Sequence, residues 1–418
     1  MILFSHPTGN ENVRQAALAF QDAGLLREFW TCLSWNPESP ANRLLPARFR
    51  RQLSRRSFHP ALRPLIRTAP AREMGRLLAG AMGVSAFSQH ETGPLSIDAV
   101  FAGLDRTVAG RLRELADCRA VYCYEDGALE TFRAAQERNL PRLYDLPIGY
   151  WRVAQQIYAE ERTREPEWTM TLSGSRDSAG KLARKDEELK LATSVVVASS
   201  FTKETLRAAE FSAGVTVIPY GAPAVADRAI VSHSGNLRVL YVGSLGQRKG
   251  LSYLLRAIDL LGRNVEFTLI GKKVADGCRP LEEALRRHHW IPTLPHGEIL
   301  AQMQRHDVLV LPSLFEGFGL VILEAMAQGL PVITTAHSAG PDLVSEGVDG
   351  FIVPIRSAEA IAEKLERLAG NPTLLEEMKQ AARMKAAGRR WESYRDSLAQ
   401  MARDVILNSF PISYAASP

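Results

Sequence analysis

The 418-residue chain lacks several features that would indicate particular classes of protein. It has four cysteines and none forms a Cys-x-x-Cys pair, so neither a zinc-ligand spacing nor a disulfide framework is indicated. No apolar run approaches 18 residues, and the first residues do not have the basic and long apolar regions of a signal peptide. We therefore expect a globular protein with ordinary thiols in a reducing cytoplasm.

The excess of positive over negative charge is also small, because the formal net charge is only +5. The segment from Arg43 to Arg76 holds ten arginines and one acid, Glu73, and so carries +9, which leaves −4 for the other residues. A nearly neutral protein with one basic segment is not typical of a nucleic-acid binder, and no motif of that class is present. We therefore predict no nucleic-acid partner.

Apolar and basic residues alternate within the basic segment. Arg50-Arg51 and Arg55-Arg56 alternate with Phe49, Leu53 and Phe58, which is typical of a short basic amphipathic piece. The segment predicts peripheral attachment to the inner face of an anionic membrane, or an anionic acceptor such as a lipid-linked sugar. A solvated arginine-rich face explains the same pattern, and both interpretations stay open.

Short apolar runs alternate with helical sequence along the whole chain, which indicates parallel sheets covered on both faces. The expected strands are Ile2–Phe4, Phe29–Leu33, Ala120–Tyr124, Arg142–Tyr144, Ser194–Ala198, Val215–Ile218, Arg238–Val242, Glu266–Ile270, Val308–Leu311, Val332–Thr334 and Phe351–Val353. The expected helices include Val13–Phe20 with Asn10 as N-cap, Thr107–Leu115, and a long helical region over Arg152–Ala192. The fold class is α/β, with two doubly wound domains that face a cleft.

We divide the chain into an N-terminal domain, a linker, a C-terminal domain and a final helical segment. The Ala-, Pro-, Ser- and Gly-rich stretch 222–235 predicts the linker between residues 1–221 and 236–385. Residues 386–418 are expected to pack back on the N-terminal domain. Ligands of such domains gather beyond the carboxyl ends of the strands, so the loops there are the candidate sites.

One such loop runs from Gly243 to Gly250 and contains Arg248 and Lys249. Glycines let a ligand approach the main chain, and two cations beside a helix N-terminus favour an anion. The loop is therefore a candidate phosphate cradle. A polar turn with solvated cations explains it equally well.

A second loop follows the expected strand Val308–Leu311. Glu316 lies among its glycines, and Glu324 lies one to two turns into the helix that follows, so both carboxylates can face one crevice. Glu316 can accept hydrogen bonds from sugar hydroxyls, and Glu324 can accept two from a vicinal diol. The N–H groups of Gly317, Phe318 and Gly319 open the helix and can bind phosphate oxygens. The agreement of these features favours a ligand site over a solvated helix.

These residues resemble a known family. Glu316-Gly-Phe-Gly-Leu-Val-Ile-Leu-Glu324 resembles the E-x7-E signature of retaining glycosyltransferases of the group 1 type (family 4), which have the GT-B fold. Tyr-Val-Gly-Ser-Leu-Gly-Gln-Arg-Lys-Gly, Thr-Leu-Ile-Gly271 and Gly347-Val-Asp-Gly-Phe-Ile-Val-Pro354 agree in order and spacing. The resemblance covers Arg238 to about Pro354 and is much weaker over the first 220 residues.

The resemblance implies a nucleotide-sugar donor in the C-terminal domain and a glycan, lipid-linked or small-molecule acceptor in the N-terminal domain. It implies that Arg248, Lys249 and Glu316 are catalytic, with the two cations on the diphosphate. It also implies that Trp290–Pro295 lies beside the base. The donor-binding residues that it implies are Gly243, Ser244, Gly271, Leu294, Gly317, Phe318, Gly319, Leu320 and Glu324. His6 and Gly9 are candidates on the acceptor side, although a lone histidine is more often structural.

Two positions depart from the family's pattern. Many relatives carry an arginine where this chain has Ser244, so phosphate neutralisation would depend mainly on Arg248 and Lys249. Many relatives also carry a histidine shortly after the strand that corresponds to Arg142–Tyr144, and this chain has none there. Asp145 either replaces that histidine as a catalytic group or is a turn residue that bonds its own backbone.

No Asp-x-Asp sequence occurs, so the metal clamp of the other major glycosyltransferase fold is not indicated. We expect a hexosyltransferase-like retaining enzyme of polysaccharide biosynthesis with no metal and no other cofactor. The alternatives are a non-catalytic GT-B subunit that binds a nucleotide-sugar, or another GT-B enzyme such as a sugar-nucleotide epimerase or an inverting transferase.

Overall fold

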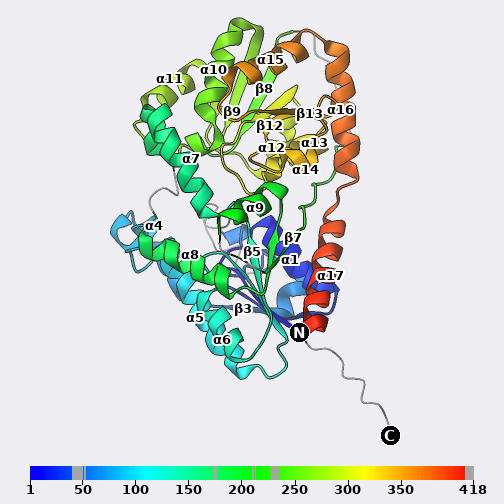
Figure 1. The fold of residues 1–418 in the computed structure, drawn as a ribbon. Helices are drawn as coiled ribbons and strands as arrows, with labels where there is room; N and C mark the ends of the chain where they lie inside the picture. Colours follow the sequence, from blue (N-terminus) through cyan, green and yellow to red (C-terminus); the bar gives the residue numbers. More distant parts are fainter. Residues whose placement is uncertain are drawn as a thin grey trace.

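A computed structural model describes residues 1–39, 50, 53–172, 177–209, 211, 213–226 and 235–409. These residues form two parallel sheets with helices around each, and the two sheets lie one above the other in Figure 1. The seven-stranded sheet has the order β3-β2-β1-β4-β5-β6-β7, and the six-stranded sheet has the order β10-β9-β8-β11-β12-β13. This confirms the expected α/β class with two Rossmann-like sheets.

The strands of the N-terminal sheet are β1 (Ile2–Ser5), β2 (Leu26–Thr31), β3 (Ile66–Thr68), β4 (Ala120–Tyr124), β5 (Arg142–Leu146), β6 (Ser194–Val197) and β7 (Gly214–Val217). Those of the C-terminal sheet are β8 (Leu237–Val242), β9 (Val265–Ile270), β10 (His289–Ile291), β11 (Val308–Leu311), β12 (Val332–Thr335) and β13 (Gly350–Val353). Every strand pair is parallel.

The N-terminal helices are α1 (Glu11–Asp22), α4 (Ala71–Ala81), α5 (Ile97–Glu114), α6 (Leu129–Glu137), α7 (Trp151–Arg164), α8 (Ala179–Leu191) and α9 (Ser200–Thr205). The later ones are α10 (Leu251–Leu261), α11 (Arg279–Arg287), α12 (His296–Met303), α13 (Leu320–Ala327), α14 (Gly340–Leu343), α15 (Ala358–Ala369), α16 (Pro372–Ala387) and α17 (Trp391–Ser409). Short 3₁₀ turns are η1 (Pro60–Leu65), η2 (Ser85–Ser88), η3 (Pro166–Thr171), η4 (Leu206–Ala208), η5 (Gln247–Lys249) and η6 (Gly262–Asn264).

The N-terminal sheet is buried on both faces, as its apolar strands predict. Along β4, Tyr122 belongs to one hydrophobic cluster, whereas Val121 and Cys123 belong to another. Because successive side chains of a strand point to opposite faces, these two clusters lie on the two sides of the sheet. The first cluster continues into the C-terminal domain, so the two domains share apolar contacts.

The final helix returns to the N-terminal domain. α17 lies beside α1 at the bottom of Figure 1, although these helices are far apart in the sequence. The predicted boundary at residue 385 falls inside α16. Most of the predicted linker lies outside the described residues, which resume at Gly235.

The structure corrects several expected elements. The sheets gain β3 and β10, which are three-residue strands at sheet edges with polar members and therefore carry little pattern. The region Arg152–Ala192 is not one long helix, because it contains α7, η3 and α8. Thr107–Leu115 is only the second half of α5. Asn10 precedes α1, but its side chain makes no capping hydrogen bond.

The basic segment is less amphipathic than its sequence indicates. Phe58 is buried and its ring contacts Phe29, so it belongs to the core and not to an exposed apolar face. Arg56 and Arg76 both contact the buried carboxylate of Glu73. Four other members of the segment, Arg43, Arg48, Phe49 and Arg51, lie outside the described residues. Within the described ranges, no helix is both long and apolar enough to cross a bilayer.

Candidate functional site

The loops that follow β8 and β11 meet at the carboxyl edge of the C-terminal sheet, because these strands are neighbours. Arg248 and Lys249 lie on η5, and Glu316 lies in the loop between β11 and α13. The Lys249 ammonium contacts the Glu316 carboxylate. Arg248 Nη1 lies 3.3 Å from Glu316 Oε2 and donates to the carbonyl of Phe315 at 3.0 Å. The structure thus brings together three residues that the sequence predicted as catalytic.

Main-chain contacts hold these two loops against each other. The carbonyl of Arg248 accepts hydrogen bonds from the N–H groups of Leu314 (2.9 Å) and Phe315 (3.3 Å). Gly250 has φ 69°, and a Cβ there would lie 2.0 Å from the carbonyl oxygen of Pro312. Only glycine fits this left-handed turn and this close approach. The glycine that ends the basic loop therefore sets the distance between the cations and Glu316.

Lys249 and Glu316 form a largely enclosed ion pair with Arg248 beside it. The three side chains are 11%, 14% and 21% exposed, respectively. Burial and the nearby Arg248 lower the pKa of Lys249, while contact with the carboxylate acts in the opposite direction. Two basic groups facing one carboxylate leave the site ready to accept an added anion.

The start of α13 follows the Glu316 loop and touches the N-terminal domain. Gly319 precedes the helix with φ 84°, and no side chain caps the first turn. The carbonyl of Gly317 accepts hydrogen bonds from the hydroxyls of Ser199 and Thr202, the latter at 3.0 Å. A Cβ on Gly317 would lie 1.8 Å from the carbonyl oxygen of Pro147. The glycine loop is therefore one of the points at which the two domains meet.

Glu324, one turn further along α13, lines a cavity of about 450 Å³ between the domains. Its Oε1 lies 3.0 Å from Nε2 of His296, the first residue of α12. The lining residues are Glu11, Arg14, Gly221, Pro223, His296, Leu320, Glu324 and Trp391. Two predicted donor-binding residues, Glu324 and Leu320, therefore share a cavity whose other walls come from α1, the end of the N-terminal domain and α17.

Phe318 connects the glycine loop to the junction between the domains. Its ring is buried and lies 4.9 Å from that of Tyr220, which also contacts the rings of Trp391 and Tyr394. A Cβ on Gly221 would lie 2.4 Å from the main-chain nitrogen of Trp391. These contacts join the donor loop, the end of the N-terminal domain and α17 in one packed unit.

The remaining predicted donor-side residues lie on neighbouring strand ends. A Cβ on Gly271 would lie 1.7 Å from the carbonyl oxygen of Gly243, so the loops after β8 and β9 cross closely there. The indole N–H of Trp290 donates to the carbonyl of Gly271 at 2.9 Å. Ser244 is exposed, and Leu294 is half-buried and packs against the core. Of these residues, Gly243 lies close to the basic pair, since a Cβ there would lie 3.9 Å from Cε of Lys249.

Asp145 requires a correction. As a catalytic group or as a turn residue, Asp145 was expected in the loop after the strand. It lies instead within β5, where it pairs with Tyr124 and Val196. Its side chain is 2% exposed and accepts a hydrogen bond from the Tyr122 hydroxyl at 2.5 Å. Burial raises the pKa of Asp145 to about 7, against the effect of that bond. It is neither a turn residue nor exposed to the cleft, where Pro147 lies instead.

The acceptor-side candidates are enclosed as well. His6 is 7% exposed, and its Nδ1 lies 3.0 Å from the N–H of Thr8. Burial lowers the pKa of His6 to about 4, so a structural role explains it. Gly9 is buried, and a Cβ there would lie 2.8 Å from the ring of Phe58. That Cβ would also lie 3.6 Å from Nε of Arg14, which lines the interdomain cavity.

Sequence reasoning missed a polar connection between the domains. Glu161 of α7 is fully buried and accepts hydrogen bonds from Gln247 (2.7 Å), Tyr253 (3.1 Å) and Arg356 (2.5 Å). These three donors belong to the C-terminal domain. Gln247 lies directly before Arg248, so this network also anchors the basic loop. A lone glutamate in a polar helix gave no signal of this role.

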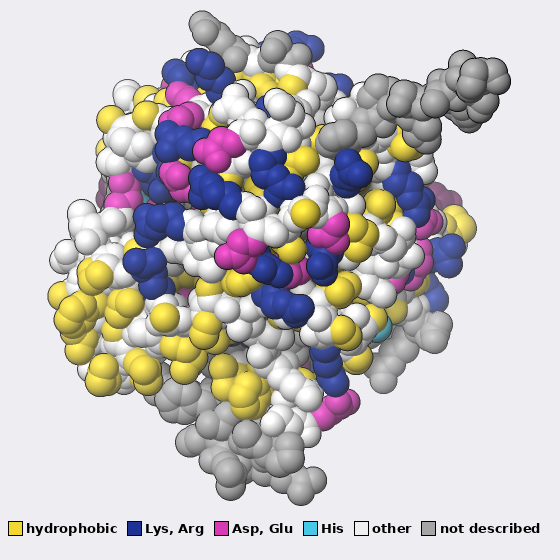
Figure 2. Space-filling view, turned by 90° about the horizontal axis from the view of Figure 1, so that it is seen from below, with side chains coloured by type: hydrophobic (Ala, Val, Ile, Leu, Met, Phe, Trp, Pro, Cys, Tyr) yellow, Lys and Arg dark blue, Asp and Glu magenta, His cyan; other side chains and the backbone are white. Residues whose placement is uncertain are grey.

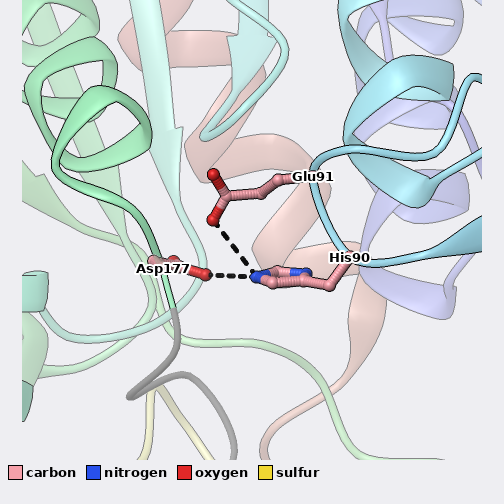
Figure 3. A group of neighbouring side chains, drawn as sticks. All are labelled: His90, Glu91 and Asp177. Atoms are coloured by element: carbon pink, nitrogen blue, oxygen red, sulfur yellow. Dashed lines mark hydrogen bonds and ion pairs between the residues drawn. The ribbon is translucent and has the colours of Figure 1, made fainter.

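Another polar group lies in the N-terminal domain, away from the predicted residues. Figure 3 shows the side chains of Glu91 and Asp177 pointing toward Nε2 of His90, at 3.2 Å and 3.1 Å. These are metal-ligand types, and their ligand atoms lie within 4.8 Å of one another. Lys181 Nζ, however, lies 3.2 Å from the same oxygen of Asp177 and 2.9 Å from Asp98. Lys181 already balances the negative charge of these carboxylates, so we treat His90, Glu91 and Asp177 as part of an ion-pair cluster and not as a metal site.

Comparison with known proteins finds a family that resembles the second half of the chain. Residues 226–389 match the family described as glycosyl transferases group 1. This part of the chain belongs to that family. The amylovoran biosynthesis glycosyltransferase AmsK of Erwinia amylovora is 34% identical over 151 residues, which are 32% of this chain and 36% of AmsK. Alpha-D-kanosaminyltransferase of Streptomyces kanamyceticus is 30% identical over 183 residues, which are 40% of this chain and 45% of that enzyme.

The matches to these group 1 relatives thus cover less than half of each curated protein.

Solved structures are similar over nearly the whole chain. Sucrose-phosphate synthase from Thermosynechococcus elongatus has a TM-score of 0.68 at 19% identity and covers 97% of this chain and 99% of its own. Anabaena HepE, solved in complex with UDP, has a TM-score of 0.61 at 16% identity and covers 96% and 99%. The chain has the GT-B fold, as the resemblance implied, whereas membership of family 4 stays a prediction.

Proposed function

We propose that this protein is a glycosyltransferase that moves a sugar from a nucleotide-diphosphate sugar to an acceptor hydroxyl. The observation that carries the proposal is the meeting of Arg248, Lys249 and Glu316 beside the uncapped start of α13, where the two domains are in contact. Group 1 relatives named as glycosyltransferases and the UDP complex of HepE support it.

The donor diphosphate is the anion that this site fits. Its oxygens take the excess positive charge of Arg248 and Lys249 and the N–H groups at the start of α13. Burial lowers the pKa of Lys249, and a bound diphosphate acts in the opposite direction by stabilising the ammonium form. Glu316, released from its ion pair with Lys249, then accepts hydrogen bonds from the sugar hydroxyls. Glu324 accepts hydrogen bonds from the ribose diol.

Bond breaking places negative charge on the departing diphosphate. Charge-assisted hydrogen bonds contribute about 1.5–3 kcal/mol each. Three or four that strengthen as the bond breaks supply about half of the ~8 kcal/mol or more that enzymes typically remove from a barrier. Orientation of the acceptor between the two domains supplies the rest. The acceptor oxygen forms the new bond to the sugar carbon, the bond to the diphosphate breaks, and the acceptor proton goes to the diphosphate.

We further propose that the reaction retains the configuration at the sugar carbon and uses no metal. Retention follows from the resemblance to retaining group 1 enzymes, with attack on the face that the diphosphate leaves. The two basic side chains and the helix start supply the positive charge that a divalent cation would otherwise provide. Product configuration by NMR and activity with excess chelator test these two points separately.

The experiment is a panel of UDP-, GDP- and ADP-sugars, tested for binding by calorimetry and for hydrolysis without acceptor. We expect one donor class to bind and to be hydrolysed slowly. Lys249→Ala should abolish turnover with unchanged circular dichroism, while Lys190→Ala, an exposed lysine on α8, should leave it unchanged. Binding without turnover under any condition would favour a non-catalytic subunit, and formation of a new nucleotide-sugar would favour an epimerase.

We also propose that one face of the N-terminal domain attaches to an anionic membrane surface, the inner leaflet in a cell. Figure 2 shows hydrophobic side chains gathered at the left of the lower face, the side on which α4 lies in Figure 1. Six large hydrophobic residues between α4 and the start of α5 are between 37% and 71% exposed: Met74, Leu78, Met82, Val84, Phe87 and Ile97. Met74 and Leu78 lie on α4 and Met82 directly follows it, so the three form a stripe at intervals of four residues.

Charge favours a lipid surface as the occupant of this face. The stripe begins within the segment 43–76, which carries +9, and each basic residue near an anionic leaflet contributes about 1 kcal/mol. We expect sedimentation with vesicles that contain an anionic lipid at low salt and not with zwitterionic vesicles. Leu78→Glu should weaken that binding, whereas Leu260→Glu should not, although Leu260 on α10 is the more exposed of the two. Failure of the unaltered protein to sediment, or equal sedimentation of both variants, would refute attachment.

A further inference from the structure

Glu324 is not a free carboxylate in this structure. Its Oε1 lies 3.0 Å from Nε2 of His296, and these two side chains are 20% and 60% exposed. His296 begins α12, and Glu324 lies in the middle of α13, which packs against α12. The pair therefore forms part of the wall of the 450 Å³ cavity and is open to a ligand that enters it.

The geometry leaves the carboxylate able to accept more bonds. His296 engages Oε1, and among the described residues no hydrogen bond is made to Oε2. An ionised carboxylate has about four acceptor positions, so a diol can bind while the imidazole stays in place. The histidine thus fixes the direction of the carboxylate without occupying it.

The charged groups around the cavity favour a protonated imidazole. His296 faces Glu324 on α13 and Glu11 on α1, and both carboxylates raise the pKa of His296, the hydrogen bond to Glu324 most strongly. Burial acts in the opposite direction. Arg14, the other charged residue of the lining, lies 3.4 Å from Glu11 and donates to the carbonyl of Arg55 at 2.7 Å. A protonated imidazole makes the hydrogen bond to Glu324 charge-assisted.

We infer that His296 is a positioning residue that holds Glu324 ready for the ribose diol of the donor nucleotide. This inference rests on the proposed function. A glutamate side chain that must become ordered on binding loses rotamer freedom, and earlier ordering by a neighbour tightens binding by about tenfold. The contact acts on Glu324 and not on the reacting atoms, so its removal weakens nucleotide binding and leaves the chemical step largely unchanged.

The test is calorimetric binding of UDP, GDP and ADP, followed by the 2′,3′-dideoxy form of whichever binds. We compare the unaltered protein with His296→Ala, His296→Gln and the control His59→Ala, an exposed histidine of the other domain. His296→Ala should bind the ribonucleotide about tenfold more weakly and the dideoxy form equally well. His296→Gln, which keeps an N–H donor, should restore most of the affinity.

The pH profile separates positioning from a merely structural role. Between pH 5.5 and 8.5 the unaltered protein should lose affinity relative to His296→Gln as the imidazole loses its proton, since only the imidazole titrates. Equal affinities and equal ribose-to-dideoxyribose ratios for the unaltered protein and His296→Ala would overturn the inference and leave the proposed function intact. Absence of any nucleotide binding by the unaltered protein would overturn both.

Discussion

Substitution of Gly317 by alanine tests the meeting of the two domains most directly. A Cβ there would lie 1.8 Å from the carbonyl oxygen of Pro147 and 2.8 Å from Cα of Ile148. Both are main-chain atoms of the other domain, so no side chain can rotate away. Reaching a tolerable C···O separation of about 3.3 Å requires roughly 1.5 Å of displacement between the loops.

That displacement acts on the residue next to Gly317. Glu316 would move relative to the loops that line the acceptor side, and a misplacement of about 1 Å costs about 100-fold in rate. Overpacking costs about 1–3 kcal/mol of stability, and about 2–4 °C of melting temperature is lost for each kcal/mol in a domain of this size. Gly317→Ala should therefore lose activity far more severely than it loses the fold.

The assay is the initial rate of nucleotide release at saturating donor, together with thermal unfolding. Gly110→Ala is the control, because a Cβ at that position in α5 meets nothing within 4 Å. We expect a rate about 100-fold lower for Gly317→Ala and an unchanged rate for Gly110→Ala. A turnover within about threefold of the unaltered protein would refute the idea that this contact sets the position of Glu316.

Two further predictions concern buried carboxylates. Glu161→Ala should lower the free energy of unfolding in urea by about 3 kcal/mol, because Arg356 then loses a buried partner; a loss below about 1 kcal/mol would contradict this. The pKa of Asp145 is about 7 in the folded state and near 4 in the unfolded state, so the folded state keeps a proton that the unfolded state releases between these pH values. This group therefore reduces the stability of the fold as pH rises from about 4 to about 7, by up to about 4 kcal/mol. Asp145→Asn should flatten the pH dependence of unfolding between pH 4 and pH 8, and an unchanged slope would contradict the assignment.

The sequence predicted most strands because their side chains are apolar over four to six residues. β8, β9 and β11 lie within one residue of the expected bounds. β10 and β3 were missed because an edge strand buries little and so needs no apolar pattern. Asp145 was misplaced for a related reason, since a charged residue inside a buried strand contradicts that pattern. The Tyr122 hydroxyl, from a neighbouring strand, gives this buried carboxyl group a hydrogen-bond partner.

The sequence by itself determined the class of fold and the two loops of the C-terminal site, because strand periodicity, glycines and helix starts act over a few neighbouring residues. The glycines and charges of those loops also indicated Arg248, Lys249, Glu316 and Glu324. Only the tertiary structure decided what these residues contact. The partners of Glu324 and Gly317 come from other helices and from the other domain, at separations of 28 residues for His296 and 115 for Thr202. Such contacts depend on how the two sheets and α17 pack together, and no local pattern records that packing.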